Sequence, residues 1–443
     1  MKVPVCAIFD IGKTNKKLFL FNENYEIVLE KSTQFTETQD EDGDPCEDVQ
    51  LLKNWVLKCF EEVSQLEEYE IRALNFSTYG ASFVHLNDKG EVIAPLYNYL
   101  KPYPKYLRKQ FYDTYGGEEH FAQQTASPVL GSLNLGMILY RLKYEKPTLF
   151  AQIKHSLHLP QYISFLFTRK YYSDITSIGC HTSLWDFKKN QYHEWVEKEG
   201  ILEKLAPIQR FNNLFSHSGY APRHHSFNIG TGLHDSSAAL IPYLATFTES
   251  FVLISTGTWC ISLNPFNHIP LTTNELQQDC LAYMQYTGKP VKASRLFAGN
   301  EHEQETKRLA KHFQKPNDYY KTVKYRIEII DKLNSKNTSF ADKDLSVFET
   351  YEQAYHQLIS DIVAQQKTST DLVIHNAPVK QLFVDGGFGK NEIYMNLLAK
   401  AFPEMEVYAA SVAQATALGA ALAIHSDWNT KEIADNLINL KRF

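Results

Sequence analysis

FNIGTGLHDSSAALIP, residues Phe227–Pro242, is the stretch on which the interpretation of this chain depends. The segment Gly230–Gly232 predicts a loop whose small residues bring the backbone close to a ligand. An apolar run with helix-like composition, Ala238–Leu244, follows it. Asp235 is therefore expected on a loop at the start of a helix, where catalytic groups often occur. The alternative is that Asp235, or its neighbour Ser236, only caps the helix.

Composition and charge limit the classes of function. The chain has 443 residues, enough for two or three domains, and its 44% hydrophobic and 22% charged content is ordinary for a soluble protein. The net charge of −6, without a basic tail, argues against a nucleic-acid partner. No apolar run reaches the length of a membrane helix, and no signal peptide is evident. Six scattered cysteines without a C-x-x-C pair predict reduced thiols in a cytoplasmic protein.

Two similar patterns of strand, turn and strand divide the chain. Val3–Phe9 and Lys17–Phe21 are β-rich and flank a polar turn around Gly12. Phe251–Ser255 and the residues from 259 to 263 flank a second turn, Thr256–Thr258. The two units form a weak internal repeat, which predicts two similarly built halves that meet near residues 230–240.

The rest of the pattern predicts an α/β protein. Apolar residues recur at helical spacing in several segments, and short β-rich runs separate them. The predicted helices are Asp48–Leu66, Leu133–Tyr144, Gln161–Thr168, Asn300–Phe313, Asp318–Leu333, Ser346–Gln366, Ile393–Phe402 and Gln414–Ile424. The further predicted strands are Tyr25–Lys31, Ile71–Phe76, Gln381–Asp385 and Val407–Ala409, with a hairpin of Phe83–Leu86 and Val92–Leu96.

The two turns are candidate phosphate sites. The first is not a P-loop, because the Gly required five positions before Gly12 is Ala7 and the next segment is a strand. A tight turn can still bind phosphate through consecutive backbone N–H groups, and Asp10 would then lie where Mg²⁺ is needed. The second turn offers the same chemistry. Gly386 and Gly387, between a strand and a helix, would let a planar base approach the backbone.

Three segments resemble the FGGY family of carbohydrate kinases, and in particular its rhamnulokinase and fuculokinase branch. They are STYGASFVHLNDKGEVIAPL at residues 77–96, STGTW at 255–259, and the triplet His234–Ser236. The resemblance extends over nearly the whole chain. It implies two ribonuclease H-like domains of the actin and hexokinase type with a cleft between them. We expect the first domain to span residues 1–235 and the second 236–443.

The resemblance also implies roles for individual residues. Asp235 would be the general base that takes the proton of the sugar hydroxyl, and Asp10 would organise Mg²⁺. The implied ATP-binding residues are Lys13, Thr14, Asn15, Lys16, Lys17, Thr256, Gly257, Thr258, Gly386, Gly387 and Asn391. The implied substrate-binding residues are Tyr79, Gly80, His234, Ser236 and Asn300.

The implied activity is ATP-dependent phosphorylation of a ketose, with ATP and Mg²⁺ as cofactors. A 6-deoxyketose such as L-rhamnulose or L-fuculose would become its 1-phosphate. The alternatives are a pentulose 5-kinase similar to xylulokinase or ribulokinase, and a nucleotide-binding ATPase or sensor without sugar chemistry. A homodimer is the assembly that we consider. Two departures affect the site: Lys13 replaces a small residue, and Ser82 stands where the branch usually has Asp.

Overall fold

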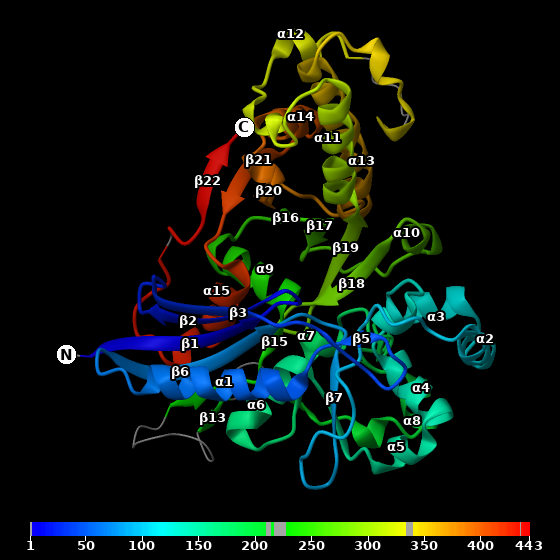
Figure 1. The fold of residues 1–443 in the computed structure, drawn as a ribbon, viewed down its shortest axis with the longest axis vertical. Helices are drawn as coiled ribbons and strands as arrows, with labels where there is room; N and C mark the ends of the chain where they lie inside the picture. Colours follow the sequence, from blue (N-terminus) through cyan, green and yellow to red (C-terminus); the bar gives the residue numbers. More distant parts are fainter. Residues whose placement is uncertain (1, 210–213, 217–226, 334–339, 435) are drawn as a thin grey trace.

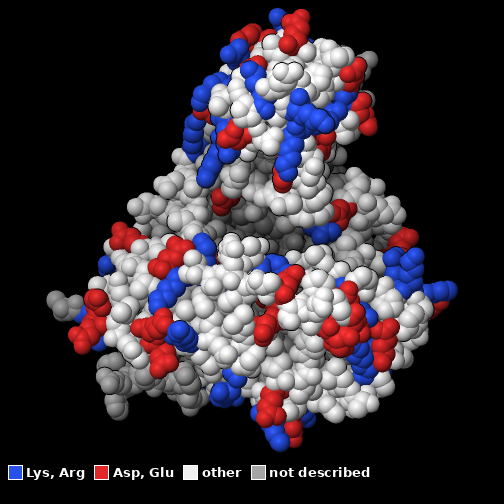
Figure 2. Space-filling model, in the orientation of Figure 1, with Lys and Arg blue, Asp and Glu red and all other residues white. Residues whose placement is uncertain are grey.

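Two seven-stranded sheets, each with its own helices, form two parts of the molecule (Figure 1). The space-filling view shows a hollow between them (Figure 2). The computed structural model describes residues 2–209, 214–216, 227–333, 340–434 and 436–443. In Figure 1 the N-terminal sheet lies in the broad lower part, and much of the C-terminal half forms a narrower upper part. This arrangement matches the predicted pair of α/β domains.

The first sheet is built around the N-terminal hairpin. Its strands are β1 Val3–Ile11, β2 Asn15–Asn22, β3 Ile27–Gln34, β6 Tyr69–Thr78, β13 Phe215–Ser216, β14 Asn228–Ile229 and β15 Leu233–His234. The strand order is β13-β14-β6-β1-β2-β3, and β15 also pairs with β6. β1 and β2 are antiparallel, whereas β6 runs parallel to β1.

The second sheet repeats this plan. Its strands are β16 Phe251–Thr256, β17 Cys260–Asn264, β18 Cys280–Met284, β19 Pro290–Leu296, β20 Gln381–Gly386, β21 Glu406–Ser411 and β22 Asn439–Arg442. The order is β18-β19-β17-β16-β20-β21-β22. β16 and β17 form the second hairpin, and β20 runs parallel to β16. The prediction of two similarly built halves is therefore confirmed.

Helices and short strands elaborate the first half. The helices are α1 Val49–Ser64, α2 Lys105–Thr114, α3 Glu118–Thr125, α4 Gly136–Glu145, α5 Pro147–Gln152, α6 Leu159–Thr168, α7 Ile175–Ile178 and α8 Glu194–Lys198. The short strands are β4 Thr38–Gln39, β5 Pro45–Cys46, β7 Phe83–Leu86, β8 His155–His158, β9 Ser173–Asp174, β10 Trp185–Asp186, β11 Gln191–Tyr192 and β12 Ile208–Gln209. In α1 the predicted helical stripe is buried, and Asp48 caps the helix by accepting hydrogen bonds from the amides of Gln50 and Leu51.

The second half has fewer and longer helices. They are α10 Thr273–Gln277, α11 Ala298–His312, α12 Ile327–Ile330, α13 Tyr351–Ile374 and α14 Glu392–Ala401. Short 3₁₀ helices occur in both halves, at Gly131–Leu133, Leu202–Lys204, Tyr319–Thr322, Phe340–Asp342, Leu345–Val347, Phe388–Lys390 and His425–Asp427. Within the part of the chain that the structure describes, no helix has the length and apolar character needed to cross a bilayer.

Two helices join the halves at the hollow. α9 Asp235–Thr246 follows β15, and α15 Ala415–Leu422 packs against it so closely that a Cβ on Gly419 would lie 1.8 Å from the carbonyl oxygen of Ala238. α15 also reaches the first sheet, where the side-chain amide of Asn75 donates to the carbonyl of Ala420 at 2.8 Å. The small residues of α15 therefore allow helix and sheet from opposite ends of the chain to meet.

Three sequence-based predictions of secondary structure were wrong. Val92–Leu96 is not a strand: its two end residues make one isolated bridge each, Val92 with Leu86 of β7 and Leu96 with Glu47, whereas β7 pairs along its length with β8. Asp318–Leu333 is not one helix but two short ones with extended residues between them, because its aromatic and aliphatic side chains pack onto the core around α13. The helix predicted at 346–366 begins later and ends later, since Thr350 caps α13 at its start.

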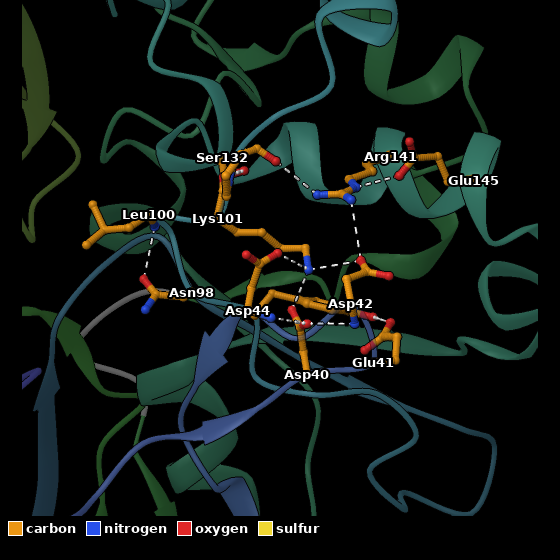
Figure 3. A network of polar contacts seen from close by, with 12 residues as sticks. Asp40, Glu41, Asp42, Asp44, Asn98, Leu100, Lys101, Ser132, Arg141 and Glu145 are labelled. Atoms are coloured by element: carbon orange, nitrogen blue, oxygen red, sulfur yellow. Dashed lines mark hydrogen bonds and ion pairs between the residues drawn. The ribbon is translucent and has the colours of Figure 1, made fainter.

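A buried ion cluster fixes the loop between β7 and α2. The Lys101 ammonium, of which 2% is exposed, lies 2.5 Å from Asp40, 2.9 Å from Asp42 and 2.8 Å from Asp44 (Figure 3). The Asp40 carboxylate also accepts hydrogen bonds from the amides of residues 42 and 44. These bonds hold the acidic loop against the segment that carries Tyr99, a residue of the site described below.

Candidate active site

Asp235 is the first residue of α9, directly after β15. His234 occupies the N-cap position, so Asp235 is not the capping residue itself. Its Oδ1 accepts a hydrogen bond from the Ser236 amide at 2.6 Å, and 31% of its side chain is exposed. Burial raises the pKa of Asp235 to about 6, although the bonds from Ser236 act in the opposite direction. A carboxylate with this pKa can accept a proton near neutral pH.

Asp10 brings a second carboxylate to the same site from the end of β1. Thr416, in α15, donates its hydroxyl to Asp10 Oδ2 at 2.7 Å. Burial raises the pKa of Asp10 to about 6, and the charge of Asp235 adds to the increase, while Lys17 opposes it. The charge of Asp235 thus disfavours the ionised form of Asp10, and a cation beside Asp10 would relieve that repulsion.

Oxygen donors at this place fit Mg²⁺ better than a softer metal. The Asp10 carboxylate and the Thr416 hydroxyl are hard oxygen ligands. No group of three or more His, Cys, Asp or Glu side chains suited to a metal occurs among the described residues. Mg²⁺ matches that sparse set, because it is commonly held by one or two carboxylates together with substrate phosphates and water.

The first turn closes as the sequence predicts. The Gly12 amide donates to the carbonyl of Asn15 at 2.9 Å, which completes the β1–β2 hairpin. Thr14 and Asn15 are exposed at its tip. The Asn15 side-chain oxygen accepts a hydrogen bond from Gln34 at 2.8 Å. The turn therefore offers a hydroxyl and backbone groups to an incoming anion.

The three lysines of this hairpin point in different directions. Lys16 is 1% exposed, and its ammonium bonds Glu47 and the carbonyl of Lys13, both at 2.8 Å. Strand alternation explains this, since Asn15 and Lys17 flank Lys16 on the opposite face. Lys17 pairs with a partly exposed Glu30 at 3.2 Å and also acts on Asp10. Of the pair Lys16 and Lys17, Lys17 is therefore the one whose charge acts on Asp10.

Lys13 extends toward aromatic residues of the first half. Its ammonium lies 2.7 Å from Glu37 and 3.8 Å from Glu47. It also lies 5.7 Å from the ring centre of Tyr79 and 6.0 Å from that of Tyr99. Burial raises the pKa of Tyr99, and both Lys13 and Asp235 act on its hydroxyl. Lys13 is therefore on the side of the predicted sugar residues.

The second turn is linked to the glycine pair. The hydroxyl of Thr256 donates to the carbonyl of Asp385 at 2.6 Å and accepts from the amide of Phe388 at 3.1 Å. Gly386 has φ of 95°, and a Cβ there would lie 2.0 Å from the Thr256 carbonyl oxygen. Only glycine fits this position, whereas Gly387 faces open space. The site for a planar base is therefore open on one side.

A cavity of about 450 Å³ adjoins the second turn. The start of α11 lies against this turn, because a Cβ on Gly299 would fall 1.8 Å from the carbonyl oxygen of Gly257. The backbone amide of Asn300 donates to the carbonyl of Thr258 at 3.1 Å, so the backbone of Asn300 lies at the second turn. The cavity is lined by Gly257, Thr258, Gly299, His302, Glu303, Thr306, Lys307, Asn317, Asp318 and Tyr320.

Asn391 has a structural task at the glycine site. It is the N-cap of α14, where its side-chain oxygen accepts hydrogen bonds from the amides of Ile393 and Tyr394. Its amide nitrogen donates to the hydroxyl of Tyr355 at 2.9 Å. Asn391 therefore positions the start of α14 behind Gly387, and its own polar atoms already have protein partners.

The predicted sugar residues are packed tightly. Tyr79 is 7% exposed and Ser82 is 3% exposed; burial raises the pKa of Tyr79, and the neighbouring Ser82 opposes that increase. Gly80 lies against the ring of His234, which a Cβ would approach to 2.9 Å. His234 itself is 4% exposed. Ser236, in the first turn of α9, is only partly buried. Ser82 thus supports Tyr79 and does not line an open surface.

Sequence reasoning missed several residues of this site. Thr416 belongs to an apolar run and meets Asp10 only through the packing of α15. Tyr99 and Glu47 meet Lys13 from separate segments. The small residues at 298–300 were a local signal for the close approach of α11 to the second turn, since a glycine at a helix start often marks close backbone approach.

Comparisons with known proteins agree with this geometry. Residues 5–208 match the family model described as "FGGY family of carbohydrate kinases, N-terminal domain", and residues 248–432 match "Carbohydrate kinase FGGY, C-terminal domain". A rhamnulokinase from Mannheimia succiniciproducens is 24% identical over 284 residues, which are 59% of this chain and 55% of that protein. The chain thus spans about half the length of this curated relative.

Solved structures share the whole fold. A carbohydrate kinase from Novosphingobium aromaticivorans superposes with a TM-score of 0.80 at 21% identity, covering 100% of this chain and 94% of that one. A ligand-bound xylulose kinase from Lactobacillus acidophilus gives a TM-score of 0.79 at 15% identity, covering 99% and 92%. At these identities the likeness establishes the two-domain fold.

Proposed function

Because the chain belongs to the FGGY family of carbohydrate kinases, which phosphorylate sugars with ATP, we propose that its acceptor is a ketose and that Asp235 is the general base. The finer proposal is a 6-deoxyketose such as L-rhamnulose or L-fuculose, converted to its 1-phosphate. The observation that carries the proposal is that Asp10 and Asp235 lie at the same edge of the first sheet, because β1 and β15 both pair with the end of β6, next to the β1–β2 turn.

Asp235 provides the proton acceptor. The sugar hydroxyl loses its proton to the carboxylate, the sugar oxygen bonds to the γ-phosphorus, and the bond from that phosphorus to the β,γ-bridging oxygen breaks. ADP leaves with the electron pair of the broken bond. A pKa near 6 leaves most Asp235 deprotonated at pH 7, yet makes it a stronger base than an ordinary aspartate.

The opposing walls hold the nucleotide. Thr14 and the turn around it contact the phosphates from the first half, and the segment 256–258 contacts them from the second. The cavity beside α11 and the open face of Gly387 accept the adenosine. Mg²⁺, held by Asp10, would neutralise charge on the phosphates. Thr416 fixes the carboxylate orientation for that task.

The sugar lies on the other side of Asp235. Tyr99 and Lys13 provide an aromatic face and a cation there, and Gly80 with Ser236 borders the same region. The name of the curated relative supports a 6-deoxyketose. A pentulose 5-kinase is the second candidate, since a xylulose kinase has the same fold. Membership of a carbohydrate kinase family disfavours an ATPase without sugar chemistry.

A panel of ketoses tests the proposal. Purified protein would be assayed for ADP release with L-rhamnulose, L-fuculose, L- and D-xylulose and L- and D-ribulose, and product esters would be located by NMR. We expect the highest kcat/KM for a 6-deoxyketose, with phosphate on O1. A preference for a pentulose and phosphate on O5 would replace the first candidate by the second.

Three further sequence-based statements stay predictions: the domain limits at 235/236, a cytoplasmic setting and a homodimer.

A further inference from the structure

A row of buried side chains lies behind Asp235. Cys180 follows α7, and its Sγ lies 3.2 Å from His181 Nε2 and 3.1 Å from His234 Nε2. His234 Nε2 is also 3.1 Å from Asp235 Oδ1. At the far end, His181 Nδ1 is 3.1 Å from the carbonyl oxygen of Leu133. The mechanism above uses only the last member of this row, Asp235.

The far end of the row fixes the first proton. A carbonyl oxygen only accepts hydrogen bonds, so His181 must carry its proton on Nδ1 and donate it to Leu133. Burial lowers the pKa of His181 to about 3, so the ring is neutral and Nε2 is an acceptor. Burial also raises the pKa of the Cys180 thiol, which therefore keeps its hydrogen. The S–H group donates that hydrogen to His181 Nε2.

The second proton follows from the first. With its hydrogen committed, the sulfur of Cys180 can only accept from His234 Nε2. Burial lowers the pKa of His234 to about 3, so this ring carries one proton. Its Nδ1 has a weaker partner, the Ser237 hydroxyl at 3.5 Å, which already donates to a backbone carbonyl at 2.8 Å. The two short contacts of the His234 ring, with Cys180 Sγ and Asp235 Oδ1, are both at Nε2 and both are with acceptors. The proton of the ring is therefore on Nε2.

We propose that Cys180 and His181 are positioning residues for the general base. They keep the proton of His234 on Nε2, where the single N–H is shared between the Cys180 sulfur and Asp235 Oδ1, each 3.1 Å away. That oxygen also accepts from the Ser236 amide. These contacts fall on one carboxylate oxygen, so among the described residues they leave Oδ2 directed to the sugar hydroxyl. The kinetic part of this inference rests on the proposed function, whereas the proton positions do not.

Other groups near the row do not supply this donor. The charge of Asp235 raises the pKa of Asp10 and of the hydroxyls of Tyr99 and Tyr283, and none of the three is a donor to it. Tyr283 also stacks on the ring of His234 at 5.7 Å and meets that of His181 edge-on. Arg295 acts on Cys180 and His181, and His158 is a buried neutral ring nearby. The stacking fixes the orientation of the His234 ring, and the contacts of Cys180 with His181 and His234 determine which ring nitrogen carries the proton.

The proton positions can be read directly by NMR with ¹⁵N-labelled histidine, where two-bond couplings distinguish Nε2–H from Nδ1–H. The His181→Leu and Cys180→Ser variants assist assignment. We expect Nε2–H for His234 and Nδ1–H for His181 in the parent protein, and the same His234 tautomer in Cys180→Ser, whose hydroxyl both donates and accepts. In His181→Leu the thiol is free to turn toward His234, so His234 should change to Nδ1–H.

Kinetics then test the positioning role. Cys180→Ala should lower kcat about tenfold with little change in KM for ATP, and raise the acidic limb of the pH profile by about half a unit to one unit. Cys180→Ser should restore both. Cys59→Ala, which removes a buried thiol of α1, is the matched control and should change neither. An Nδ1–H tautomer of His234 in the parent would overturn the inference. An Nε2–H tautomer of His234 that persists in His181→Leu would overturn it too. Loss of all sugar-dependent turnover in the parent refutes the proposed function without moving these tautomers.

Discussion

Replacing Asp235 by Asn should separate catalysis from stability. The change removes the charge but keeps an oxygen that can accept the hydrogen bond from the Ser236 amide. If Asp235 is the base, kcat should fall about 10²–10⁴-fold, the usual contribution of a positioned proton acceptor. ATP binding should persist, because the proposed nucleotide contacts lie on the two turns and at the cavity beside α11.

The same variant should be more stable than the parent at neutral pH. In the folded protein the pKa of Asp235 is raised from 3.8 to about 6. A carboxyl with a raised folded pKa carries no penalty below its unfolded pKa, and the full penalty appears above the folded pKa. A shift of about two units corresponds to about 3 kcal/mol. Because 31% of the side chain is exposed, solvent screening reduces the expected gain to about 1–2 kcal/mol.

Urea unfolding of parent and variant at pH 4 and pH 7.5, with kcat at pH 7.5, measures both effects. The stability difference should grow between pH 4 and pH 6 and stay constant above. Asp48→Asn, at the exposed N-cap of α1, is a matched control and should change little in either assay. Activity within a few-fold of the parent would refute the role as base. A variant that is less stable at pH 7.5 would favour the structural alternative.

Four other substitutions test separate parts of the site. Asp10→Ala should abolish Mg²⁺-dependent turnover while calorimetry still detects the sugar, and persistent turnover at ordinary Mg²⁺ would contradict this. Lys16→Met should destabilise the fold by about 3–5 kcal/mol, because Glu47 would lose its buried partner. Lys17→Met should instead raise KM for ATP with little change in the urea midpoint. A loss of stability in Lys17→Met and a raised KM for ATP in Lys16→Met would contradict this assignment of the two lysines. Ser82→Asp should lower the melting temperature, since Ser82 is buried against Tyr79. It should change kcat/KM for two ketose epimers by the same factor, and unequal factors would show that Ser82 contributes to substrate specificity.

Local patterns were enough to predict the framework. Both hairpins and the strand that leads to Gly386 are where the sequence placed them, because turn glycines and β-rich runs are short-range signals. The buried stripe of α1 follows from its spacing for the same reason. Asp235 and Asp10 could be predicted as candidates, since each is the acidic residue beside such a turn.

Contacts between distant segments could not be predicted. Thr416 reaches Asp10 across 406 residues of chain, and only the packing of α15 on the first sheet brings them together. The directions of Lys13 and Lys16 depend on the register of β2 and on Glu47, which is contributed by another segment. Alternation along β2 offered a usable signal for Lys16, because its neighbours at 15 and 17 face the other way.

Sugar-dependent ADP release by the parent and by Asp235→Asn, measured side by side, tests the central claim most directly. For the best ketose of the panel, the account predicts strong stimulation of ATP consumption in the parent and its loss in the variant, with the same low rate in both when sugar is absent. Equal, sugar-independent ATP hydrolysis by the two proteins would contradict the account, as would stimulation that survives in Asp235→Asn.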